Sequence, residues 1–161
     1  MLGILIFLNV IQLLYFNVFT HSLPYGIYIK VNANPSVGDY AATCLTPEIA
    51  HYGMERGYLE RGICGTGTVR VLKIIEGIPG SHFWVKDGFL RINRHSYKIM
   101  VKDSLGRPLP MFYNRKEGTL SKGQYMLLSD FVDNSWDSRY WGPVSIQFLL
   151  KPFWMFEDIK K

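Results

Sequence analysis

The sequence begins with an almost unbroken apolar run over residues 2–20, which contains no charged side chain. A run of this length is about the minimum for a helix that crosses a bilayer. We therefore expect an N-terminal membrane anchor over residues 1–20 and a single domain over residues 21–161. A cleaved signal peptide and a buried core helix are the alternatives. Against a signal peptide, no basic segment precedes the run and no Ala-x-Ala site follows it.

After this run, apolar residues occur in short stretches separated by turn residues, and the chain contains 15 glycines and 8 prolines. This pattern predicts strands joined by turns and argues against a helical bundle. The expected strands are residues 26–31, 39–43, 68–75, 83–85, 97–101, 124–129 and 144–150. The sequence therefore predicts a mainly β fold of antiparallel coiled sheets.

One helix is expected over residues 47–59. Thr46 is a suitable N-cap and Pro47 suits the first helical position. Gly53 and Gly57 weaken this helix, because glycine has a low helix propensity. The expected domain is thus a β fold with one short helix.

The net charge of +5 comes from basic residues that are spread along the chain and form no dense run. No nucleic-acid-binding motif accompanies them, so we expect no nucleic-acid partner. Attraction to the anionic headgroups of membrane lipid is one use for such charges. A merely solvated surface is the other interpretation.

Lys73 lies inside an apolar, strand-like stretch. On a strand it shares a face with Val71 and Ile75, which would remove it from water. Burial disfavours the charged form of lysine and lowers its pKa, so such a lysine can act as a base toward a serine hydroxyl. Ser22, just beyond the apolar run, is a candidate for that hydroxyl. The alternatives are a lysine whose ammonium reaches water and a serine that belongs to a turn.

The four histidines offer no competing site. His21 adjoins Ser22, but neighbouring strand residues point to opposite faces, so it should face away. His51, His82 and His95 lack the spacing of a metal-binding pair. We expect no metal and no cofactor.

Three segments together resemble the type I signal peptidase family. Residues 135–142, Ser-Trp-Asp-Ser-Arg-Tyr-Trp-Gly, are similar to a conserved block of that family throughout. Ser22-Leu23-Pro24 resembles its nucleophile block, and residues 72–80 resemble its lysine block, although Ser81 stands where aspartate is usual. Residues 103–110, Asp-Ser-Leu-Gly-Arg-Pro-Leu-Pro, resemble a segment of the conjugal-transfer peptidases of the TraF type, which is the branch that fits best.

The resemblance implies roles for particular residues. Ser22 would attack the scissile carbonyl and Lys73 would act as general base. The backbone N–H of Ser22 and the hydroxyl of Thr20 would stabilise the oxyanion. Ser135 would orient the Lys73 ammonium by a hydrogen bond.

Asp137 and Arg139 lie in the same block, and two interpretations of them stay open. Asp137 is either a catalytic residue, as the transfer-peptidase branch implies, or the partner of Arg139 in a structural ion pair.

Cys44 and Cys64 are the only cysteines. An even number in an exported domain permits one disulfide. Two unpaired buried cysteines are the alternative.

The resemblance also implies a function. The chain would be a membrane-anchored serine endopeptidase with a Ser/Lys dyad, and its catalytic domain would lie in the periplasm of a bacterium, at the inner membrane. Its substrate would be an exported precursor, foremost a conjugative pilin, and the conjugative secretion machinery would be a further partner. Hydrolysis and end-joining of peptides both stay open. A general signal peptidase and a catalytically silent scaffold of a secretion complex are the alternatives.

Overall fold

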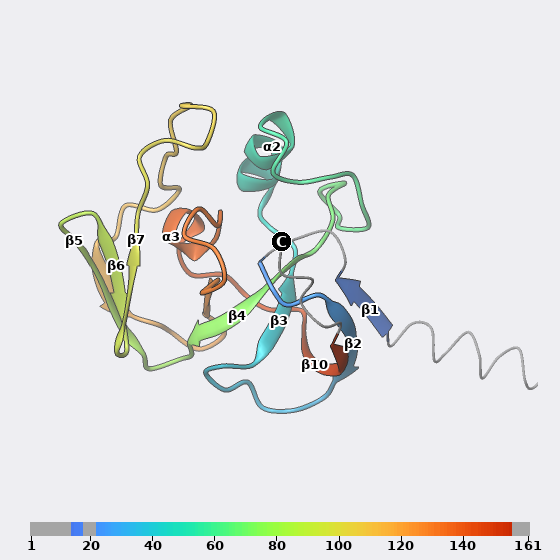
Figure 1. Cartoon of the computed structure of the whole chain (residues 1–161). Coiled ribbons are helices and arrows are strands. Elements are labelled where there is room, and N and C mark those ends of the chain that lie inside the picture. The colour runs from blue at the N-terminus through green and yellow to red at the C-terminus, as the bar shows by residue number, and fades with distance from the viewer. Residues whose placement is uncertain (1–13, 18–21, 156–161) are drawn as a thin grey trace, which may run out of the picture.

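Two antiparallel sheets form the domain in the computed structural model, which describes residues 14–17 and 22–155 (Figure 1). The larger sheet has the strand order β1-β2-β10-β3-β4-β9 and the smaller has the order β7-β6-β5-β8. The strands of the larger sheet are β1 (Leu14–Asn17), β2 (Gly26–Val31), β3 (Tyr40–Thr43), β4 (Val71–Gly77), β9 (Met126–Leu128) and β10 (Phe148–Met155). Those of the smaller sheet are β5 (His82–Lys86), β6 (Phe89–Ile92), β7 (His95–Lys98) and β8 (Glu117–Thr119). The helices among the described residues are α2 (Pro47–Glu55) and α3 (Ser138–Trp141).

The last strand of the chain completes the larger sheet in its middle. β10 pairs with β2 on one side and with β3 on the other, so that Leu149 lies opposite both Val31 and Ala41. β3 in turn pairs with β4, and Ala41 lies opposite Lys73. The segment that follows Ser22 and the strand that carries Lys73 therefore belong to one sheet.

A hairpin organises the smaller sheet. β5 and β6 are joined by Asp87 and Gly88, which both have positive φ, of 53° and 76°. This is the favoured two-residue hairpin turn, and an Asp-Gly pair suits it. One apolar cluster, containing Phe83, Leu90 and Met126 among others, joins this sheet to β9 of the larger one. In Figure 1 the two sheets stand side by side and β4 runs between them.

The mainly β, antiparallel fold confirms the prediction. β2 has the predicted bounds, and the predicted helix is present but ends at Glu55. Thr46 is its N-cap residue, although its side chain makes no capping hydrogen bond. The sequence reasoning missed β6, β8 and α3, and it placed the last strand too early, because β10 extends to Met155.

The apolar N-terminal run differs from the prediction where it is described. Its residues 14–17 form strand β1, which pairs with β2, and they are not part of a membrane-spanning helix. Within the described ranges no helix is long and apolar enough to cross a bilayer. The remainder of the predicted anchor lies outside the described residues.

Candidate active site

Lys73 lies within β4, where both faces of the strand are largely buried. Its side chain is 5% exposed, and the residues on either side of it in the chain, Leu72 and Ile74, are largely covered. The Nζ atom contacts the Oγ atom of Ser22 and donates a hydrogen bond of 3.0 Å to the Oγ atom of Ser135. The fold thus brings together three residues that the sequence places 51 and 62 positions apart.

Burial is the main influence on the charge of Lys73. It disfavours the ammonium and lowers the pKa of Lys73 from 10.5 to about 8. The negative charge of Asp137 opposes this shift, and the positive charge of Arg139 adds to it. At pH 7 a lysine with a pKa of 8 is neutral in about one molecule of eleven, against about one in three thousand at a pKa of 10.5.

The segment that carries Ser22 is attached to a loop that follows β9. The hydroxyl of Ser129 donates a hydrogen bond of 2.9 Å to the backbone carbonyl of Ser22. Next to it, Leu23 is 2% exposed, and the Tyr28 hydroxyl donates to the carbonyl of Pro24 over 2.6 Å. These contacts fix the backbone of residues 22–24 and thereby the position of the Ser22 hydroxyl. Sequence reasoning missed Ser129, because its hydroxyl acts on a backbone atom of a distant segment.

Asp137 and Arg139 form a fully buried pair. The carboxylate of Asp137 accepts hydrogen bonds from the Arg139 guanidinium, of 2.9 and 2.8 Å, and from the Arg139 backbone N–H. It also accepts from the backbone N–H of Ser129 at 3.3 Å. The pair is thereby linked to the contact between Ser129 and Ser22. Within the described ranges, Asp137 makes no hydrogen bond to Lys73 or to the Ser22 hydroxyl, so it acts on Lys73 through its charge.

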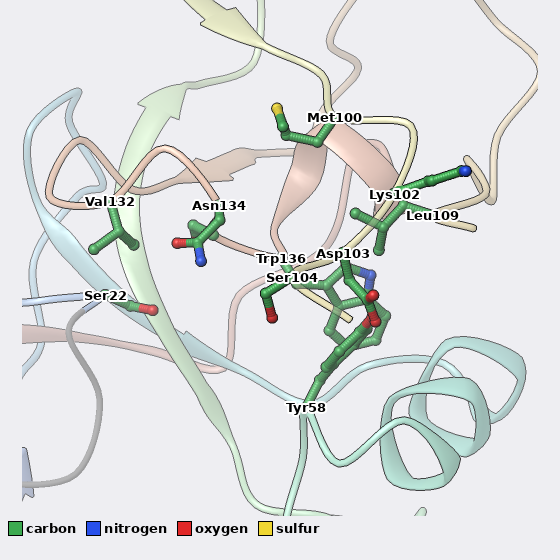
Figure 2. Close-up of a pocket in the computed structure, with 11 residues that line it drawn as sticks. Ser22, Tyr58, Met100, Lys102, Asp103, Ser104, Leu109, Val132, Asn134 and Trp136 are labelled. Carbon is green, nitrogen blue, oxygen red and sulfur yellow. The ribbon is translucent and has the colours of Figure 1, made fainter. Parts of the chain in front are cut away.

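A cavity of about 480 Å³ opens beside Ser22 (Figure 2). Tyr58 and Trp136 form an aromatic wall, and Ser22 lies at one end. The complete lining is Ser22, Tyr58, Met100, Lys102, Asp103, Ser104, Leu109, Val132, Asn134, Ser135 and Trp136. A cavity of this size falls in the range of ligand-binding pockets. The catalytic candidates therefore adjoin a space that a peptide can enter.

The disulfide-closed segment over residues 44–64 supplies Tyr58 to the aromatic wall and packs against Trp136. Cys44 and Cys64 are joined by a disulfide that encloses α2. A side chain on Gly53 of this helix would lie within 2.7 Å of the Trp136 ring. The glycine that weakens the helix in isolation thus makes room for the tryptophan beside Ser135.

The other predicted residues lie apart from this site or outside the described residues. Thr20 and His21 lie outside the described residues, so the second oxyanion donor stays a prediction. His51 pairs with Glu55 on the exposed side of α2. His95 pairs with the buried carboxylate of Glu76 at 2.8 Å.

One group of potential metal ligands occurs within the described ranges, and it consists of Glu76, His95 and Asp130. The fold brings these residues together from distant segments, so the spacing of histidines did not indicate them. Its histidine and its buried glutamate are already paired with each other.

The family sequence model described as "Signal peptidase, peptidase S26" matches residues 3–150. The chain belongs to the signal peptidase family. The matched segment of this family member includes Ser22, Lys73 and Ser135, and its fold brings these three side chains together.

This signal peptidase family member is also similar to proteins of plasmid transfer. It is 35% identical to a plasmid transfer protein TraF of Escherichia coli over 132 residues, which are 78% of this chain and 73% of the relative. A second plasmid transfer protein TraF of Escherichia coli is 30% identical over 141 residues, covering 83% and 78% of the two chains. A probable conjugal transfer protein TraF of Sinorhizobium fredii is 28% identical over 131 residues, covering 78% and 67%. The predicted resemblance is confirmed.

Proposed function

We propose that this protein is a serine endopeptidase in which Ser22 is the nucleophile and Lys73 is the general base. The contact between Lys73 Nζ and Ser22 Oγ, in a site where burial lowers the pKa of the lysine, is the observation that carries the proposal. Neutral Lys73 accepts the Ser22 proton as the hydroxyl oxygen attacks the scissile carbonyl. The resulting ammonium then gives that proton to the leaving amine, and an acyl-enzyme on Ser22 remains.

The surrounding groups position this reaction. The hydrogen bond from Lys73 to Ser135 fixes the direction of the Nζ atom. The backbone N–H of Ser22 is one donor for the oxyanion, and the Thr20 hydroxyl is the second in this proposal. The carboxylate of Asp137 favours the ammonium that forms during the step, while its oxygens stay bound to Arg139. We therefore assign Asp137 and Arg139 to support of the site, with the direct catalytic role of Asp137 as the competing hypothesis.

The substrate proposed is the precursor of an exported protein, in particular a conjugative pilin. The names of the relatives support this choice, because they are plasmid and conjugal transfer proteins. In this proposal the protein acts at the outer face of a bacterial inner membrane, with its catalytic domain in the periplasm. Residues 2–13, the apolar part of the chain that precedes β1, would attach the domain to the bilayer and bring Ser22 close to its surface, where such precursors emerge.

Processing of a co-expressed pilin precursor tests the proposal. Wild type should shorten the precursor, whereas Ser22→Ala and Lys73→Ala should leave it intact while accumulating in the same membrane fraction. Lys86→Ala, which changes an exposed lysine at the end of β5, is the matched control and should process normally. Processing by both Ser22→Ala and Lys73→Ala would refute the dyad. Mass spectrometry of the product separates hydrolysis from end-joining, because a product with joined ends is lighter by one water.

A general signal peptidase is the second candidate, favoured by the description of the matched family. Rescue of a strain depleted of its own signal peptidase would support it over the pilin substrate. The scaffold hypothesis predicts that the Ser22→Ala variant supports plasmid transfer as well as wild type does.

A further inference from the structure

The cavity beside Ser22 is larger than a small side chain requires. A methyl group, for example, fills only a small part of 480 Å³. The cavity therefore has room for several residues of an extended peptide. Figure 2 shows Ser22 at one end of the lining and Lys102 at the other, with Trp136 and Ser104 between them.

Much of the cavity lining suits a large apolar side chain. Met100, Leu109 and Val132 contribute aliphatic surface, and Tyr58 and Trp136 contribute ring faces. Figure 2 shows Trp136 between the Ser22 end and the Lys102 end. Aromatic and aliphatic walls of this kind bind apolar groups, while a few polar groups fix the orientation of the ligand.

The wall that carries Lys102 is held in place by Asp103. Its carboxylate accepts hydrogen bonds from the Tyr58 hydroxyl, from the backbone N–H of Leu105 at 2.9 Å and from Arg107 Nε at 2.6 Å. The backbone of Lys102 forms a bridge to Pro108. This wall is thus ordered before any peptide binds, which lowers the entropy cost of binding.

These contacts leave one uncompensated charge at the far end of the cavity. The charge of Asp103 is balanced by Arg107, whose guanidinium is bound to it. Lys102 is exposed, and within the described ranges its ammonium makes no ion pair and no hydrogen bond. Figure 2 shows this ammonium directed away from Ser22, at the outer edge of the cavity. A cation there attracts an anionic group at the far end of a bound peptide.

We propose that this cavity is a substrate subsite that recognises a carboxylate at Lys102 and a bulky apolar side chain between that carboxylate and the scissile bond. The carboxylate is either an acidic side chain or the C-terminus of the peptide. The inference rests on the proposed function, since Ser22 marks the end of the cavity at which cleavage occurs.

Peptide binding to the full chain carrying Ser22→Ala, purified in detergent micelles, tests the subsite without requiring cleavage. Fluorescein-labelled peptides of one sequence would carry Asp or Asn at successive positions on either side of the scissile bond, each with a free or an amidated C-terminus. We expect one register in which the carboxylate tightens binding about 2- to 5-fold, as a solvent-exposed ion pair does. The preference should fall as salt is raised. In that register, replacing the intervening bulky apolar residue by alanine should weaken binding further.

Reversing the charge of Lys102 tests whether this side chain causes the preference for a carboxylate. In the Ser22→Ala background, Lys102→Glu should invert the preference, so that the Asn or amidated peptide binds better. Lys122→Glu makes the same charge change on an exposed turn outside the cavity and should leave the preference unchanged. If both variants lose the preference for the carboxylate peptide equally, the subsite proposal is refuted. It is also refuted if peptide binding depends on a carboxylate in no register.

The two proposals fail separately. If wild type cleaves the neutral and the acidic peptides with equal efficiency, the dyad stands and the subsite proposal is refuted. If Ser22→Ala prefers the acidic peptides but wild type cleaves none of them, the subsite stands and the peptidase proposal falls.

Discussion

Replacement of Lys73 by methionine should remove activity and also remove a pH-dependent cost to folding. Lys73 has a pKa of about 8 in the folded protein and 10.5 in the unfolded chain, a difference of about 2.5 pH units. At about 1.36 kcal/mol per unit, the cost of burying the ammonium is on the order of 3 kcal/mol. Methionine has a similar length and no charge, so Lys73→Met does not incur this cost.

The sign of the effect follows from where the protons are bound. Below about pH 8 the lysine is charged in both states, so wild type incurs the full cost. Between about pH 8 and 10.5 only the unfolded chain retains the proton, so the stability of wild type rises with pH. Above that range the cost is absent. The free energy of unfolding of Lys73→Met minus that of wild type should therefore fall by about 3 kcal/mol across this window.

Urea denaturation followed by tryptophan fluorescence, at a series of pH values and for both proteins in the same micelles, measures this difference. The four tryptophans supply the signal. The absolute difference also contains the loss of the hydrogen bond to Ser135, so the pH dependence is the decisive quantity. Titrations that both proteins share cancel in the subtraction. A difference that stays constant from pH 7 to 10.5 would mean that Lys73 keeps its ordinary pKa, and the argument for a lysine base would fail.

Three further predictions concern the same region. The kcat/KM of wild type on a precursor peptide should rise with pH with a midpoint near 8, the pKa of Lys73, and a profile that is flat down to pH 6 would contradict this base. Replacing Cys44 and Cys64 by alanine should lower the free energy of unfolding by about 3 kcal/mol in denaturant titrations, since the disulfide closes a loop with a sequence separation of 20. Gly53→Ala should destabilise by about 1–2 kcal/mol in the same assay, because the clash with Trp136 outweighs the gain in helix propensity, and a stabilised variant would show that the ring moves freely.

The sequence was informative about the fold where the pattern is local. The strand over residues 26–31 and the start of α2 could be predicted because alternation along a strand and the preference of proline for the first helical turn act over a few positions. β6 was missed although Asp87-Gly88 is a strong hairpin signal, and β8 is too short to have a pattern. Residues 14–17 illustrate the opposite case, because an apolar run does not by itself distinguish a membrane span from a strand that pairs with β2.

The site could be predicted only as a set of residue types. Lys73 in an apolar strand and Ser22 just beyond the apolar run were visible, but their contact depends on the pairing of β3 with β4 and on the loop after β9. Ser129 could not be assigned, because its role is a single hydrogen bond to a backbone atom 107 positions away. The requirement for Gly53 was hidden for the same reason, since its partner Trp136 lies on a distant segment.

The order of strands in the larger sheet has a consequence for synthesis of the chain. Ser22 precedes both the hydroxyl that fixes its backbone, at Ser129, and the strand that joins β2 to β3, which is β10. A ribosome delivers these parts after Ser22 and Lys73. A partly made chain can therefore contain Ser22 and Lys73 without the sheet that brings them together, and the two side chains meet only after β10 has been released.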